Sequence, residues 1–299
     1  MAFERALARW RGLGDQFCSR LNLSEAALLK IPIRYRKVDI PKRGGSTRTL
    51  HVPAMKLRAV QRSIVRTILR KLPVHPAAKG FVRRRSIVDH ASLHMAKPYV
   101  VVCDIADFFT STKAKRLRYR FQKIFGWSEA TTDLLIRLTC LPDDGGLPQG
   151  APTSPLLANI VNRSLDVRLE ALAKKRHLDY SRYADDIAFS PKEAGHPSNP
   201  DYVIRIVQFV LEDYGYELRP NKCRILRRHV RQTVTGLVVN DKCNLSRTVR
   251  RRLRAAEHRA NKGQSLSSPT QAGEETPMSA DELKGWRAYQ AMVARKPNR

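Results

Sequence analysis

Cysteine is scarce in this sequence, and its five positions form no pattern. Cys18, Cys103, Cys140, Cys223 and Cys243 are odd in number, lie scattered over 299 residues, and never form a Cys-x-x-Cys pair. These spacings exclude a disulfide framework and a zinc ribbon as organising features. They favour a reducing compartment, so we expect a cytoplasmic protein.

Long apolar runs and acidic residues are also scarce. No apolar run approaches the roughly 18 residues that a membrane-spanning helix needs, and Met1 to Trp10 lack the apolar core of a signal peptide. Asp and Glu number 27 against 56 Lys and Arg, so the formal net charge is +29. This excess predicts a polyanionic partner, for which nucleic acid is a better candidate than a membrane.

Two adjacent carboxylates stand between two strand-like segments. The sequence Tyr183-Ala184-Asp185-Asp186 follows residues 178–182 and precedes residues 187–190. Like charges this close repel, so a positive charge must offset them. A divalent cation is one candidate, because carboxylate oxygens suit Mg²⁺. A solvated Asp-Asp turn is the alternative.

A third carboxylate follows a run typical of a buried strand. The β-branched segment 99–103 predicts that strand, and Asp104 stands at its end. A carboxylate there is costly unless it is paired or bound to a metal. Asp107 is ambiguous, because it could equally cap a helix. Asp104 with Asp185 and Asp186 suits nucleotidyl transfer, in which two Mg²⁺ ions activate a 3′-hydroxyl and stabilise the leaving pyrophosphate.

A basic hairpin is a candidate phosphate-binding element. Residues 35–53 predict two strands joined by a glycine-containing tip. Lys42, Arg43 and Arg48 could bind phosphates from this hairpin. A solvated basic turn is the alternative interpretation.

The segment 147–155 predicts an irregular loop that runs into a long helix. Ser154 suits the N-cap of that helix, and Pro155 suits its first position. Gly150 lets the backbone approach another group closely. Apolar periodicity predicts further helices over 56–72, 113–125 and 129–138.

His90 and His94 stand four residues apart and could share one helix face. A zinc site would need further ligands that the sequence does not supply, so packing or hydrogen-bonding histidines are favoured. The C-terminal part begins with a very basic helix over 247–262. A Ser-, Pro- and Gly-rich linker follows over 263–279, expected to be mobile, and then a short helix over 281–294.

Three of these segments together resemble reverse transcriptases, and the resemblance covers nearly the whole chain. The segments are Asp104-Ile105-Ala106-Asp107-Phe108-Phe109, Leu147-Pro148-Gln149-Gly150 and Tyr183-Ala184-Asp185-Asp186. Each is moderately specific alone, whereas all three in this order are typical of that family.

The finer resemblance is to bacterial retron reverse transcriptases. Val234-Thr235-Gly236 matches a motif of that group, and residues 149–155 are typical of it. Residues 90–94 match the group's Asn-Ala-x-x-His motif in part, with His90 in place of Asn. Residues 283–289 resemble the ending of the family's thumb.

This resemblance implies an α+β right-hand polymerase. Fingers and a palm, with an antiparallel sheet packed on helices, would occupy residues 1–240. A small, basic and mostly helical thumb would occupy residues 241–299. The implied reaction is RNA-directed DNA synthesis with two Mg²⁺ ions per site.

The resemblance also assigns roles to individual residues. Asp104, Asp185 and Asp186 would bind Mg²⁺, with the Ile105 carbonyl as a further ligand. Nucleotide contacts are implied for Lys42, Arg48, Phe109, Gln149, Gly150 and Lys222. Primer or RNA contacts are implied for His90, His94, Val234, Thr235, Gly236, Arg247, Arg250, Arg251 and Arg254.

Two of these roles have plain alternatives. Phe109 would exclude a ribose 2′-hydroxyl, or it is an ordinary core phenylalanine. Lys222 would donate a proton to pyrophosphate, or it is a solvated lysine at a strand end.

The implied partners are a structured noncoding RNA, which serves as template and primer, its DNA product, and dNTPs. Priming from a 2′-hydroxyl would yield a branched RNA–DNA hybrid in antiphage defence. Any effector is expected to be a separate protein, because 299 residues leave no room for a fused one. Alternatives are an intron-type or diversity-generating reverse transcriptase, an RNA-dependent RNA polymerase, and a non-catalytic RNA-binding scaffold.

Overall fold

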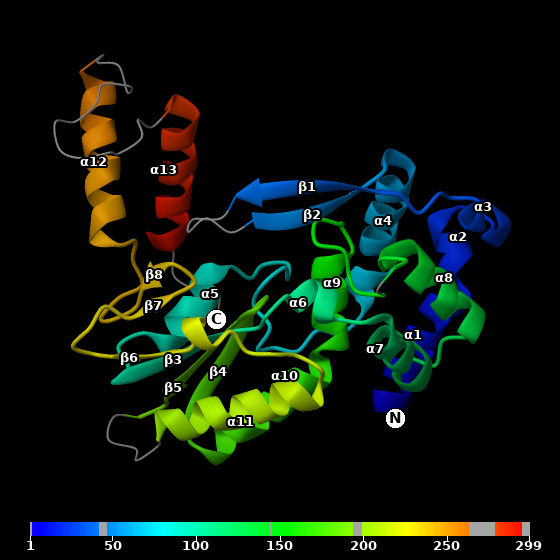
Figure 1. Ribbon diagram of the computed structural model, residues 1–299, viewed down its shortest axis with the longest axis horizontal. Helices are drawn as coiled ribbons and strands as arrows, with labels where there is room; N and C mark the ends of the chain where they lie inside the picture. The colour runs from blue at the N-terminus through cyan, green and yellow to red at the C-terminus, as the bar shows by residue number, and fades with distance from the viewer. Residues whose placement is uncertain (1, 42–46, 144, 194–198, 263–278, 295–299) are drawn as a thin grey trace.

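Figure 1 shows the computed structural model, which describes residues 2–41, 47–143, 145–193, 199–262 and 279–294. Lys42 and the linker expected from residue 263 lie outside the described residues. Among the described helices, none combines the length and the apolar character that a membrane span requires.

A four-stranded antiparallel sheet forms the centre of the fold, in the order β4–β5–β3–β6. The strands are β3 (Tyr99–Asp104), β4 (Leu178–Tyr183), β5 (Asp186–Pro191) and β6 (Arg224–Arg227). Tyr183 pairs with Asp186, so only Ala184 and Asp185 form the turn between β4 and β5. This confirms the predicted hairpin with two adjacent carboxylates at its tip.

Successive side chains of the central strands alternate between two hydrophobic clusters. Val101 of β3 and Phe189 of β5 belong to the larger cluster, whereas Val100 and Ala188 belong to the smaller one. This alternation follows from the two-residue period of a strand. Helices α10 (Arg163–Lys175) and α11 (Pro200–Asp213) cover the first face, and α5 (Ile87–Ala91) covers the second.

Most of the other helices, from α1 to α9, and a long hairpin lie to one side of this sheet (Figure 1). Leu57, Phe121 and Leu135 from this region are fully buried in the larger cluster. The elements are α1 (Ala2–Asp15), α2 (Phe17–Leu21), α3 (Glu25–Leu29), β1 (Tyr35–Pro41), β2 (Thr47–Pro53), α4 (Met55–Thr67), α6 (Phe108–Ser111), α7 (Ala114–Arg118), α8 (Glu129–Thr139) and α9 (Ser154–Val161). The hairpin predicted over 35–53 is confirmed by the β1–β2 pairing.

The single long helix expected after residue 155 is wrong, because the chain forms α9 and α10 with Asn162 between them. The Asn162 side chain is buried. It accepts a hydrogen bond from Arg116 Nη2 at 2.8 Å and donates one to Tyr216 Oη at 2.8 Å. These tertiary partners stabilise a break that apolar periodicity alone does not indicate.

Helix ends also differ from expectation. Thr153, rather than Ser154, is the N-cap of α9, and the Ser154 hydroxyl donates to the Pro148 carbonyl at 2.6 Å. The helix expected over 113–125 continues past α7 only as a π-helical turn, Tyr119–Ile124. Ser154 therefore holds the preceding loop against the helix instead of capping it.

The C-terminal part begins with a short hairpin, β7 (Thr233–Val234) and β8 (Leu237–Val238). Helices α12 (Arg247–Asn261) and α13 (Ala280–Ala294) follow and stand beside each other in Figure 1. Their buried residues, such as Leu253 and Leu283, join the smaller cluster with Val234 and Leu237.

Candidate active site

The strand register brings the three aspartates to one edge of the sheet. Asp104, the last residue of β3, pairs directly with Asp186, the first residue of β5. The Ile105 amide donates to the Asp185 carbonyl at 3.0 Å, which fixes the turn against the end of β3. Two carboxylates thus come from one hairpin and one from its neighbouring strand, as the sequence predicts.

The turn itself is held in an unusual conformation. Ala184 has a φ of 56°, in the left-handed region that costs a residue with a Cβ about 1 kcal/mol or more. Gly80 packs against it so closely that a Cβ at position 80 would lie 2.9 Å from the Ala184 nitrogen. Position 80 therefore requires glycine for close contact with the turn.

The carboxylates of the turn bind protons more tightly than ordinary aspartates. Burial, then the charges of Asp185 and Asp104, raises the pKa of Asp186 to about 7. Burial is also the main cause of the raised pKa of Asp185, and the Asp104 charge adds to it. A positive charge between these groups would stabilise their ionised forms.

Two basic side chains, those of Lys222 and Arg219, lie beside the Asp104 carboxylate. Its Oδ2 accepts a hydrogen bond from Lys222 Nζ at 2.7 Å, and Arg219 Nη1 lies 3.4 Å from its Oδ1. That Oδ1 is buried and accepts no hydrogen bond. Among the described residues, no three acidic, histidine or cysteine side chains are yet gathered closely enough to hold a metal. The donor set fits a hard divalent cation, with Asp104 paired to Lys222 in this arrangement.

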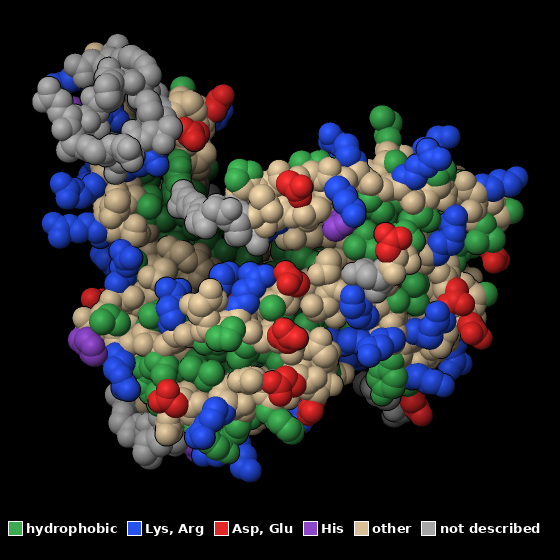
Figure 2. Space-filling view, in the orientation of Figure 1, with side chains coloured by type: hydrophobic (Ala, Val, Ile, Leu, Met, Phe, Trp, Pro, Cys, Tyr) green, Lys and Arg blue, Asp and Glu red, His purple; other side chains and the backbone are tan. Residues whose placement is uncertain are grey.

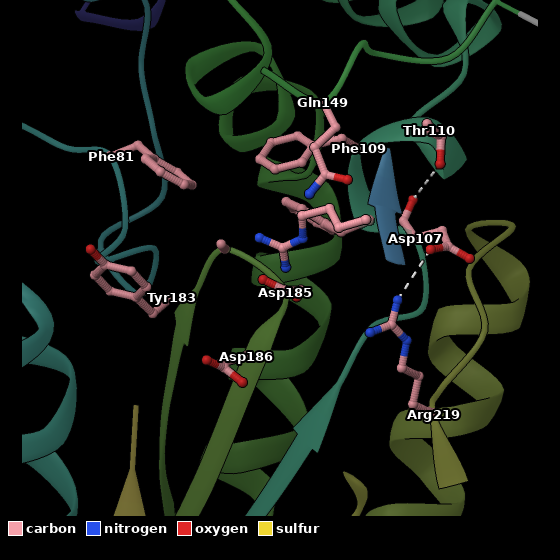
Figure 3. A pocket seen from close by; sticks show the side chains of 12 residues that line it. Phe81, Asp107, Phe109, Thr110, Gln149, Tyr183, Asp185, Asp186 and Arg219 are labelled. Carbon is pink, nitrogen blue, oxygen red and sulfur yellow. Dashed lines mark hydrogen bonds and ion pairs between the residues drawn. The ribbon is translucent and has the colours of Figure 1, made fainter. Parts of the chain in front are cut away.

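A cavity of about 260 Å³ opens beside the turn (Figure 3). Arg48, Phe109 and Gln149 line it together with Asp185 and Asp186. The structure therefore brings together three side chains to which the resemblance assigns nucleotide contacts, beside two of the aspartates. Gly150 is not among the lining residues; it has a φ of 110° and lies beside the backbone of β2.

The Gln149 loop is attached to the hairpin that carries Arg48. The His51 amide donates to the Gln149 carbonyl at 2.6 Å. A Cβ at position 150 would lie 3.5 Å from the His51 carbonyl oxygen. The loop and the hairpin therefore move as one wall of the cavity.

A second cavity, of about 560 Å³, lies on the other side of the aspartates. Asp104 and Lys222 line it with the turn Val234-Thr235-Gly236, and Tyr183 and Asp186 border both cavities. The three aspartates thus lie between a space lined by Arg48 and Gln149 and a space lined by the β7–β8 turn.

His90 and His94 are buried and lie next to serine hydroxyls of the central sheet. Their side chains are 1% and 0% exposed, and burial lowers the pKa of both, that of His90 to about 3. His90 Nδ1 lies 2.7 Å from Ser181 Oγ, and His94 Nδ1 lies 2.8 Å from Ser190 Oγ. His90 also borders the second cavity. Contact of these two histidines with RNA stays a prediction.

The basic residues of α12 lie away from both cavities. Arg247, Arg250, Arg251 and Arg254 are exposed, at the three- and four-residue spacing that puts them on one helix face. Leu253 is buried on the opposite side. Lys and Arg side chains project outward along this helix in Figure 2.

Several residues of the first cavity were missed by sequence reasoning. Phe81, Tyr183 and Arg219 line it, and Arg219 Nη2 donates to Asp107 Oδ1 at 3.1 Å. Asp107, for which helix capping is one of two alternatives, occupies the N-cap position of α6, but its side chain makes no capping hydrogen bond. A glycine directly before Phe81 is the one local signal that could have indicated a special position there.

Residues 40–252 match the protein family described as "Reverse transcriptase (RNA-dependent DNA polymerase)". The chain belongs to the reverse transcriptase family. This match covers all three aspartates, Gln149 and the β7–β8 turn. The resemblance stated from the motifs is therefore confirmed, and membership of the family implies divalent-metal dependence in general.

Retron reverse transcriptases are among the similar proteins. The retron Mx162 and Mx65 reverse transcriptases of Myxococcus xanthus are 39% and 34% identical over 85% and 78% of this chain. The retron Ec86 reverse transcriptase of Escherichia coli is 29% identical over 89% of it. The matches cover 57%, 58% and 78% of these relatives, so the chain spans little more than half the length of the first two.

Among solved structures, apo telomerase from Candida tropicalis has a TM-score of 0.50 at 12% identity, over 72% of this chain and 48% of telomerase. At this identity the likeness concerns the fold alone. It agrees with an α+β polymerase fold.

Proposed function

We propose that this chain is an RNA-directed DNA polymerase of the retron type. The observation that carries the proposal is the convergence of Asp104, Asp185 and Asp186 between two cavities, in a chain of the reverse transcriptase family. The first cavity would receive the incoming dNTP. The second would receive the primer end beside Val234-Thr235-Gly236.

The three aspartates would hold Mg²⁺, with the Ile105 carbonyl as a further ligand. Two such ions would supply activation of the 3′-hydroxyl and stabilisation of the leaving pyrophosphate. The raised pKa of Asp186 and the unsatisfied Oδ1 of Asp104 support this assignment, because both disfavour the site without added positive charge.

Side chains of the first cavity would bind and orient the nucleotide. Arg48, together with Lys42, would contact the triphosphate, since guanidinium groups bind phosphate oxygens in pairs. Gln149 would contact the nucleotide or the template. Phe109 would exclude a ribose 2′-hydroxyl, and its position in the cavity wall supports that role over a plain core phenylalanine.

Lys222 would have different roles in the metal-free site and in the metal-bound site. In this structure its ammonium group neutralises Asp104. Once Asp104 binds a cation, the Lys222 ammonium would be released and could donate a proton to the departing pyrophosphate. Its half-exposed side chain supports such mobility.

The retron relatives support a finer proposal. The template and primer would be one structured noncoding RNA, primed from a 2′-hydroxyl, and the product would be a branched RNA–DNA hybrid that acts in antiphage defence with a separate effector. The exposed arginines of α12 would hold the RNA backbone by its A-form shape. Abundant short DNA joined to RNA, co-purified from cells, would support this proposal; unbranched or absent DNA would contradict it.

Mg²⁺-dependent incorporation of dNTPs on an RNA template tests the activity. Asp185→Asn should lower the rate about 1,000-fold or more, because cation stabilisation of the transition state is worth several kcal/mol. Asp133→Asn is the matched control, since Asp133 is a half-exposed carboxylate of α8 that pairs with Arg118. Equal activity of Asp185→Asn and the control would refute the site, and an inactive wild type would favour the RNA-binding scaffold.

A further inference from the structure

Phe81 combines two costly features at the edge of the first cavity. Its side chain is 46% exposed, and its backbone has a φ of 60°. Left-handed backbone is a real outlier for a bulky residue, and an exposed phenyl ring gains little from burial. Strain of this kind persists where the surrounding structure imposes it, which is most common at functional sites.

The loop that carries Phe81 is held rigidly against the catalytic hairpin. The Lys79 amide donates to the Arg182 carbonyl at 2.7 Å, and Asn159 Nδ2 donates to the Gly80 carbonyl at 2.8 Å. Gly80 also packs directly on the Ala184 nitrogen. The position of Phe81 is thus coupled to that of Asp185 through two neighbouring backbone segments.

The cavity has an aromatic end and a charged end. In Figure 3, Phe81 and Tyr183 lie on one side, Asp107 and Arg219 lie on the other, and Asp185 lies between them. The ring centroid of Phe81 is 6.1 Å from that of Tyr183 and 6.2 Å from that of Phe109. A nucleotide has the same polarity, with a flat apolar base at one end and phosphates at the other.

We propose that Phe81 is a positioning residue that packs its ring against a nucleobase of the nascent base pair. The inference rests on the proposed polymerase function, because it takes the first cavity as the nucleotide site. Every base offers a π-face, so stacking on Phe81 would position a base pair without selecting its sequence. The base concerned belongs either to the incoming dNTP or to the template strand, and the experiment separates the two.

Phe81→Asn is the decisive variant. Asparagine tolerates left-handed backbone better than phenylalanine, so the melting temperature should stay equal or rise. The kcat/KM for dNTP should fall roughly 10- to 100-fold, the range typical of one lost base–aromatic stack. Phe81→Tyr keeps the ring and should retain activity within a few-fold.

The split of the kinetic constants identifies the base. A raised KM for dNTP with unchanged template–primer affinity assigns the stack to the incoming base. Weaker template–primer binding with an unchanged KM assigns it to the template base. Phe209→Asn is the matched control, because Phe209 is 59% exposed on α11 and lines neither cavity. The proposal is overturned if the Phe81→Asn enzyme equals this control in both its KM for dNTP and its affinity for template–primer.

A fluorescence measurement separates this inference from the polymerase proposal. A template with 2-aminopurine at or next to the templating position is bound by wild type, Phe81→Asn and Phe81→Tyr in the presence of the matching dNTP. If the stacked base is the template base, quenching should be strong with wild type and Phe81→Tyr and lost with Phe81→Asn. Loss of dNTP incorporation in wild type itself would refute the polymerase function instead. In an active enzyme, equal quenching with a raised KM for dNTP assigns the stack to the incoming base, whereas equal quenching with an unchanged KM and unchanged template–primer affinity refutes only the stack.

Discussion

At the scale of single residues, the turn between β4 and β5 depends on one buried ion pair. Arg182 and Asp166 are fully buried, and two nitrogens of the guanidinium donate to the two carboxylate oxygens at 2.7 Å. A third nitrogen of Arg182 donates to the Ala184 carbonyl at 3.0 Å. Burial alone would lower the pKa of Arg182, but the Asp166 charge and hydrogen bonds raise it above its ordinary value. This pair therefore anchors the backbone beside Asp185.

Removing Asp166 should destabilise the fold strongly. Asp166→Ala leaves the Arg182 charge buried without its partner, which typically costs 3–5 kcal/mol, so we expect a loss of about that size in the free energy of unfolding. Glu170→Gln is the control, because Glu170 pairs with Lys174 on the exposed side of α10 and should cost about 0.5 kcal/mol or less. Urea denaturation of both variants measures the difference. A cost for Asp166→Ala no larger than the control would contradict this role.

Asp186 should make the stability of the metal-free protein depend on pH. Its pKa is about 7 in the folded chain, against an ordinary 3.8. The folded state therefore binds this proton more tightly than the unfolded state does. Its stabilising effect is complete below about pH 4 and is lost as the pH rises through 7.

Added Mg²⁺ should accordingly raise the melting temperature more at pH 8 than at pH 6, because protons compete for Asp186 at the lower pH. Thermal unfolding with and without Mg²⁺ at both pH values measures this. Asp186→Asn should abolish most of the Mg²⁺-induced rise in melting temperature. It should also flatten the dependence of the melting temperature on pH between pH 5 and pH 8. A Mg²⁺-induced rise in melting temperature that is larger at pH 6 than at pH 8 would refute this competition between protons and Mg²⁺.

At the scale of elements, α12 separates its charges from its packing surface. Four exposed arginines share one face, and Leu253 and Ala256 are buried on the other. A repeat of three and four residues produces this division in any helix. The sequence therefore predicts the charged face of α12 without knowledge of its neighbours.

Binding to RNA–DNA duplex should become less sensitive to salt when this face loses charge. Each lost phosphate contact lowers the slope of log K against log salt by roughly 0.7–0.9, so Arg250→Gln/Arg254→Gln should lower it by about 1.5. Lys174→Gln/Lys175→Gln removes the same charge from exposed positions on α10 and should leave the slope within about 0.5. Equal slopes for the two double variants would exclude α12 as a phosphate-binding surface.

At the scale of the whole molecule, the two hydrophobic clusters differ greatly in extent. The larger one joins the N-terminal helices, α4, α8–α11 and one face of the sheet. The smaller one joins the other face of the sheet to α5, β7–β8 and the α12–α13 pair. Each of these last two helices buries only two side chains, among them Leu253 and Leu283. The α12–α13 pair should therefore open locally at lower free energy than the central sheet.

Hydrogen exchange followed by mass spectrometry tests this difference. Amides of α12 and α13 should exchange at least about 10-fold faster than those of β3 and α10, because fewer apolar contacts oppose their opening. A bound RNA template–primer should slow exchange in α12 while leaving β3 unchanged. Equal protection of the α12–α13 pair and of β3 and α10 in the free protein would contradict separate opening of α12 and α13.

The sequence by itself determined the parts of this protein that depend on local pattern. The buried strand before Asp104, the Asp185-Asp186 hairpin, the 35–53 hairpin and the basic helix after residue 247 follow from periods of two or of three to four residues. The family motifs lie within such elements, so the architecture and the three aspartates could be identified before any contact was known.

Only the tertiary structure decided which distant groups meet. Lys222 contacts Asp104 across 118 positions, and His90 contacts Ser181 across 91, which buries the His90 ring against the central sheet. The break at Asn162 and the placement of Phe81 over the cavity depend on partners equally remote in the chain. Local pattern reports only on residues within about one helical turn or one strand pair, whereas these positions are set by the packing of whole elements.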